Sequence, residues 1–238
     1  AALFLFLAML LAIYMLSISN NDQTIDTDNA GGGSFDAIKN SLQINEVRNI
    51  ATYVWIWTAL MTVQWITAIN IVEDWSQNSE QRLRFFAIME QVISPLTLII
   101  QLFFTNLIIK KIGIKNILLS YGILFFLAFI LYGLIPSIIS VGVVTVFLRV
   151  FEYGINKPTR ETIFSTFKKN DRYKSTVFID TFISRFGDLS GSGFIAIGKL
   201  TSIAANSFPL IAIPIAGFLS ILGIKISRNI NTKDLSIR

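Results

Sequence analysis

Charged side chains lie within or at the ends of long apolar runs of this sequence, and these are the residues that could do chemistry. A charge near the centre of a lipid bilayer costs roughly 2.5 to 3.5 kcal/mol on insertion scales. Such groups cannot face lipid, so they must pair with one another or line a wet cavity. They are Glu90, Arg149, Glu152, Lys157, Arg160, Glu161, Asp180, Arg185 and Asp188.

The first group follows a helical repeat. Arg149, Glu152, Asn156 and Arg160 are separated by three, four and four residues. This spacing predicts that they share one face of a helix. Lys157 and Glu161 form a second pair four residues apart on the same run, and we expect that pair to be structural.

A second polar face lies on the next apolar run. Asp180, Ser184 and Asp188 recur every four residues, with Arg185 beside them. Arg149, Arg185 and Asp188 are expected near the membrane midplane, and Glu161 and Asp180 near the cytoplasmic mouth.

Two such faces on consecutive antiparallel helices would pair or would enclose water. The pattern is compatible with structural salt bridges, but it favours a substrate path with a gate. Glu90 has no charged neighbour in sequence, which makes it a candidate for proton coupling or substrate binding.

Several chemistries are disfavoured by composition. The chain has no cysteine and no histidine, so it lacks thiol nucleophiles and the commonest general base and metal ligand. No GxxxxGK[ST] phosphate-binding loop is present. We therefore expect no metal, no cofactor and no enzymatic activity.

The elements that must position these residues are membrane helices. The 238 residues are 53% hydrophobic and 15% charged, against about 25% charged in ordinary soluble domains. A span needs roughly 20 mostly apolar residues. The sequence predicts an all-α polytopic membrane protein with about seven spans, at 1–18, 50–72, 85–109, 117–134, 138–157, 177–198 and 208–224.

The domain organisation follows from these runs. The first residue is alanine and opens directly into an apolar run, so we expect the chain to be a piece of a longer protein. Residues 1–18 would be the last helix of a missing bundle, and 19–49, with Gly31-Gly32-Gly33-Ser34, a flexible cytoplasmic loop. Residues 50–224 would form a six-helix bundle, followed by a cytoplasmic tail at 225–238.

The distribution of basic residues predicts the orientation. Thirteen of the sixteen lysines and arginines outside the predicted spans fall on one side of the membrane, and the exceptions are Arg82, Arg84 and Lys199. The positive-inside rule places the richer side, with the carboxyl terminus, in the cytoplasm. The basic clusters are expected to meet anionic lipid headgroups rather than nucleic acid.

Several short motifs occur in order along the chain. They are Gln101-Leu-Phe, Lys110-Lys-Ile-Gly113, the stretch Arg149–Glu161, Arg172-Tyr-Lys174, Phe178-Ile-Asp180 and Arg185-Phe-Gly-Asp188. This combination resembles the bacterial and plastidic ATP/ADP translocases, a branch of the major facilitator superfamily, and the similarity extends more weakly from about Tyr53 to Ile224.

The resemblance implies a twelve-helix protein in two six-helix halves, of which this chain would be the sixth helix, the central loop and the carboxyl-terminal half. It also implies that two groups of residues face each other near the cytoplasmic side. Asn156, Lys157, Pro158, Arg160 and Glu161 would shape the end of the tenth helix, and Asp180, Arg185 and Asp188 would face them from the eleventh.

The expected function is therefore secondary transport by alternating access, with a nucleotide as substrate, in the bacterial inner membrane. The expected partners are the lipid bilayer and the missing amino-terminal half. One alternative is transport of another small anionic or zwitterionic metabolite, coupled to protons through Glu90, Glu152 or Asp188. A membrane-embedded enzyme and a non-transporting scaffold are further alternatives.

Overall fold

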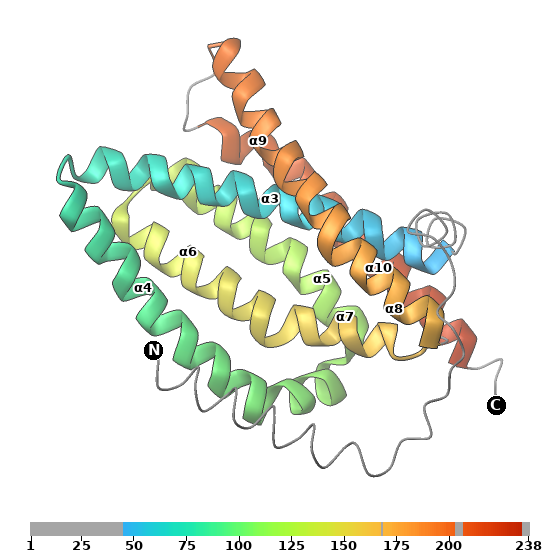
Figure 1. Ribbon diagram of the computed structural model, residues 1–238. Coiled ribbons are helices and arrows are strands. Elements are labelled where there is room, and N and C mark those ends of the chain that lie inside the picture. The colour runs from blue at the N-terminus through green and yellow to red at the C-terminus, as the bar shows by residue number, and fades with distance from the viewer. Residues whose placement is uncertain (1–44, 168, 203–206, 235–238) are drawn as a thin grey trace. The chain divides into compact units, whose positions relative to one another are not determined.

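The computed structural model describes residues 45–167, 169–202 and 207–234, and these residues form helices and turns with no strand. Figure 1 shows their arrangement. The helices are α3 (Asn45–Trp75), α4 (Ser79–Ile99), α5 (Thr105–Leu134), α6 (Ile138–Phe151), α7 (Lys157–Phe164), α8 (Lys169–Phe178), α9 (Ser184–Leu200) and α10 (Phe208–Asp234). Three π-helical turns interrupt them: η1 (Ile100–Phe104), η2 (Glu152–Asn156) and η3 (Ile179–Ile183).

Four helical stretches in this part of the chain are long and apolar enough to cross a membrane. They are Asn45–Trp75, Ser79–Leu134, Ile138–Phe164 and Phe208–Arg228. The all-helical class is confirmed, and these stretches are compatible with an integral membrane protein. The first predicted span, 1–18, and the loop up to residue 44 lie outside the described residues, as does the end of the tail.

The predicted span 177–198 is helical but is not among these four stretches. It falls within α8, η3 and α9, which together contain charged residues at positions 180, 185 and 188. The charged residues that make this run a candidate functional region also lower its mean hydropathy.

Two predicted spans fall within the single helical stretch Ser79–Leu134, which turns back at Gly113. Gly113 has φ of 81° and ψ of 152°, in a region that is essentially restricted to glycine. Figure 1 shows α5 turning back near its start, so that its later part runs alongside α6. The turn lies between the predicted spans 85–109 and 117–134, where a connection is expected.

Replacing Gly113 by alanine should destabilise the protein by roughly 1 to 3 kcal/mol, the usual cost of forcing a side chain into such a conformation. The added Cβ would meet nothing within 4 Å, so any loss comes from backbone strain alone. Gly217→Ala is the matched control, because that helical site is equally open and has no positive φ. Thermal unfolding in detergent would compare them; equal melting temperatures would contradict the assignment of strain.

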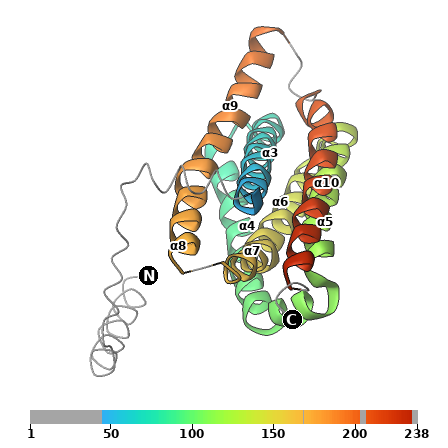
Figure 2. The same cartoon turned by 90° about the vertical axis from the view of Figure 1, so that its right-hand side faces the viewer.

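Close helix contacts are made through glycines, as is common in membrane proteins. A Cβ at Gly187 would lie 2.7 Å from the carbonyl oxygen of Trp55, and one at Gly191 would lie 2.5 Å from that of Ala59. Figure 2 shows α9 crossing α3, with α10 beside α5 on the other side. These two glycines therefore allow close helix packing, whereas a Cβ at Gly193 would meet nothing within 4 Å.

Helix α4 packs less closely than the others. Its buried residues are Met89 and Ile93, which form a small cluster with Val150 apart from the main core. Many of its apolar side chains are exposed in this part of the chain, including Leu83, Leu98 and Ile99. Its contacts with the main core include Phe85 and Phe86, whose rings lie near those of Trp75 and Trp65.

The π-turn η2 has a local cause in Pro158. Proline has no backbone N–H, so carbonyl groups one turn before it lose a helical donor. Side chains from the neighbouring helix supply replacements: Gln101 Nε2 donates to the Tyr153 carbonyl at 2.9 Å, and Thr105 Oγ1 donates to the Gly154 carbonyl at 2.5 Å. These bonds fix η2 against η1 and α5.

Candidate functional site

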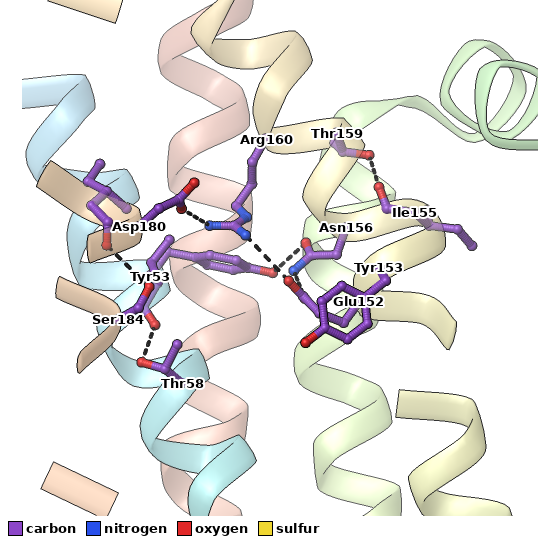
Figure 3. A network of polar contacts seen from close by, with 12 residues as sticks. Tyr53, Thr58, Glu152, Tyr153, Ile155, Asn156, Thr159, Arg160, Asp180 and Ser184 are labelled. Atoms are coloured by element: carbon purple, nitrogen blue, oxygen red, sulfur yellow. Dashed lines mark hydrogen bonds and ion pairs between the residues drawn. The ribbon is translucent and has the colours of Figure 1, made fainter. Parts of the chain in front are cut away.

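A buried polar network joins η2 and α7 to α3. The Arg160 guanidinium lies 3.3 Å from the Glu152 carboxylate, and both side chains are about 95% or more buried. Asn156 Nδ2 donates to the other Glu152 oxygen at 2.7 Å. The Tyr53 hydroxyl lies 3.4 Å from Asn156 Oδ1 and 3.2 Å from the Leu118 carbonyl. Figure 3 shows Arg160 at the centre of these contacts.

Arg160 also connects the network to η3. Its Nη1 lies 3.7 Å from Asp180 Oδ1, and the Asp180 side chain is 38% exposed. The guanidinium packs 5.0 Å above the ring of Trp57. Arg160 thus pairs with two carboxylates on different helical segments (Figure 3): that of Glu152 is buried, and that of Asp180 is partly exposed.

Two further polar groups face Glu152 without a well-formed hydrogen bond. They belong to Trp57 and Tyr121, whose Nε1 and hydroxyl group are buried and have no partner among the described residues. The Arg160 Nε atom is also buried without one. Buried polar groups are normally satisfied, so the network has spare donors around its carboxylate.

A pocket of about 250 Å³ lies beside this network, between α3, the α6–η2 junction and α9. It is lined by Met61, Thr62, Gln64, Trp65, Arg149, Tyr153 and Asp188. Its walls combine two aromatic rings, an amide, a hydroxyl group and one charge of each sign. This is a mixture of groups typical of small-molecule sites.

Arg149 reaches the pocket from α6 and forms an ion pair with Glu90 on α4. Its guanidinium also lies 5.8 Å from the centroid of the Trp65 ring. Glu90, which has no charged neighbour in sequence, therefore finds its partner in the tertiary structure. This pair links α4 to α6.

Asp188 reaches the same pocket from α9. One carboxylate oxygen accepts a hydrogen bond from the Thr62 hydroxyl at 3.1 Å, and the other lies 3.2 Å from Arg185 Nη1. The Arg185 side chain is 82% exposed. The structure thus brings Arg149 and Asp188 to one pocket, while Arg185 points away from the buried network.

Gln64 is a buried polar residue of the pocket wall. Its Nε2 donates to the Tyr132 hydroxyl at 2.9 Å and to Thr145 Oγ1 at 3.1 Å. Since both amide hydrogens are used, the carbonyl oxygen is the atom that Gln64 can offer to a ligand.

Two of the predicted groupings are wrong. Arg149 does not join Glu152, Asn156 and Arg160: it pairs with Glu90, whereas Glu152 is bonded to Asn156 and Arg160. The π-turn η2 begins at Glu152 and holds about one residue more than an α-turn, so it shifts Asn156 and Arg160 around the helix relative to Arg149. Lys157 and Glu161 form no ion pair in the described part of the chain.

One further expectation is met by the geometry. The two predicted polar faces do meet, through Arg160 and Asp180. Sequence reasoning missed Tyr53 and Tyr153 as members of the site, and it gave Gln64 and Trp65 no definite role. Pro158 is the signal in the sequence for an irregular helix at this point, because proline lacks the backbone N–H of a regular α-helix.

Comparison of the chain with protein-family models, curated proteins and solved structures finds no match.

Proposed function

We propose that this chain is the carboxyl-terminal part of a secondary transporter that works by alternating access. The observation that carries the proposal is the pocket lined by Arg149 and Asp188, two of whose walls, α3 and the α6–η2 junction, belong to helical stretches apolar enough to cross a membrane. Charged groups that line a pocket between membrane helices are typical of a substrate path.

The proposed topology has six spans in the described region, in a major facilitator arrangement. Gly113 would be the connection between two spans of the stretch Ser79–Leu134. The continuous helical run from α8 to α9 would be a further span, with Asp188 facing the pocket and Asp180 facing Arg160 instead of lipid. The carboxyl terminus would lie in the cytoplasm, and a missing amino-terminal half would complete the central site.

Exchange of ATP for ADP across the inner membrane is the proposed activity, and the resemblance of the motifs from Arg149 to Asp188 supports it. The Arg160 network would form the gate. Its bond to half-exposed Asp180 is long, at 3.7 Å, whereas Glu152 holds Arg160 in a buried position. Breaking the Asp180 contact would separate α7 from η3 while leaving the guanidinium paired.

One observation favours a second candidate, a zwitterionic metabolite. The pocket presents one cation and one anion, Arg149 and Asp188. A substrate that carries both an ammonium and a carboxylate group would complement that pair directly. This candidate shares the fold and the transport mechanism and differs in the substrate alone.

The test uses the full-length protein expressed in intact bacterial cells. We expect saturable uptake of labelled ATP, followed by efflux of label when excess unlabelled ADP is added. Membrane fractionation would verify that the protein is present. Uptake equal to that of the empty vector would sink the nucleotide assignment, and labelled amino acids and other zwitterions would then be tested in the same cells.

A further inference from the structure

We propose that the pocket between α3, η2 and α9 binds the uncharged, flat heterocyclic part of the transported molecule, a nucleobase with its sugar. The polyanionic part would be bound by residues outside this pocket. The inference rests on the proposed function, since it divides a nucleotide substrate between two regions of the transporter.

The charge of the pocket carries the first step. Its two charged lining residues are Arg149 and Asp188, and each already has a partner of opposite sign, Glu90 and Arg185. The four charges cancel. A polyphosphate chain is recognised by uncompensated cations, and this lining supplies none. The phosphates therefore have no counterpart here.

The shape and the aromatic residues carry the second step. Trp65 and Tyr153 line the pocket beside Met61, and the flat faces of nucleobases stack on such rings whatever the base. At about 250 Å³, the pocket falls below the roughly 300 Å³ at which sites for whole drug-sized ligands begin. It suits one end of a nucleotide rather than the whole molecule.

The hydrogen-bonding groups carry the third step. The Gln64 amide is held by Tyr132 and Thr145 through its nitrogen, which leaves its carbonyl oxygen as an acceptor. The Asp188 carboxylate, though it accepts from Thr62 and Arg185, has further lone pairs. Acceptors held in place complement N–H donors, and nucleobases carry such donors on their edges.

The experiment measures binding of tritiated adenosine to the full 238-residue chain in lipid nanodiscs by equilibrium dialysis. We expect saturable binding that excess inorganic tripolyphosphate does not displace. Trp65→Ala should weaken adenosine binding roughly 5- to 150-fold, the loss expected when one stacking ring is removed. Trp65→Phe, which keeps a ring, should restore most of it.

Trp75→Ala is the matched control, because Trp75 is an exposed tryptophan at the end of the same helix and does not line the pocket. It should bind adenosine like the unmodified chain. The inference is overturned if adenosine does not bind saturably, if tripolyphosphate displaces it, or if Trp65→Ala and Trp75→Ala behave alike while both remain helical by circular dichroism.

The two proposals fail separately. Exchange of ATP in cells without adenosine binding to this chain would overturn the division of the substrate and leave the transport activity standing. Adenosine binding that depends on Trp65, in a protein that exchanges no nucleotide, would overturn nucleotide exchange and leave the pocket assignment in place.

Discussion

Arg160→Leu should lower the free energy of unfolding by about 3 to 5 kcal/mol, the cost of leaving a buried carboxylate without its counter-ion. Glu152 is 98% buried, and Arg160 is its one cationic partner among the described residues. The substitution also removes the contact with Asp180 and the packing on Trp57. Unfolding in mixed detergent micelles, followed by circular dichroism, would measure the loss.

Two variants separate charge from packing. Adding Glu152→Gln to Arg160→Leu removes the uncompensated charge, and it should recover much of the lost stability. Lys157→Leu removes an exposed cation from the same helix and should change stability by about 1 kcal/mol or less. If Arg160→Leu were no more damaging than Lys157→Leu, the network would not contribute to stability as described.

Arg149→Ala should reduce ATP uptake by about 30-fold or more. Removing this cation leaves Asp188 as the charged residue of the pocket lining and leaves Glu90 without its partner. At a separation of about 8 Å, Asp188 and one negative charge of the substrate would repel each other by roughly 2 kcal/mol at an effective dielectric constant of 20. That energy corresponds to about a 30-fold reduction in uptake, and a polyanionic substrate would be repelled at least this strongly. Initial uptake rates, normalised to the amount of protein in the membrane, measure the effect.

The double variant Glu90→Gln with Arg149→Gln is the informative partner, because it removes both charges of the ion pair and keeps the pocket balanced. It should transport faster than Arg149→Ala. Equal inactivity of the two variants would mean that Arg149 touches the substrate itself, and the account based on balanced charge would then be wrong.

The helices were largely predictable because hydropathy alone determines them. The apolar run 208–224 lies within α10, and the run 138–157 spans α6 and η2. The phase of the helix after Phe151 was not predictable from spacing, because it depends on Pro158 and on donors from Gln101 and Thr105. Those donors come from a segment about fifty residues earlier, and the local sequence around Pro158 does not predict them.

The charged residues that form ion pairs in the structure were predictable, but their pairing was not. A charge within an apolar run must find a partner, and Glu90, Arg149, Glu152, Arg160, Asp180 and Asp188 each have one. Which charge meets which depends on how α4 packs against α6 and how α7 meets η3. Helical spacing therefore suggested one continuous face where the structure has two separate clusters.

The contact between α3 and α9 has a consequence for how the protein is made. Helix α9 is not among the stretches apolar enough to cross a membrane by themselves, yet its glycines fit closely against the carbonyl oxygens of Trp55 and Ala59. Under the proposed topology, α9 would insert poorly into the membrane by itself during synthesis. Helix α3 is synthesised more than a hundred residues earlier and would already be inserted, so it would bind α9 and hold it in the bilayer. Weakening that surface would show first as failed insertion of the sixth predicted span, before any loss of transport.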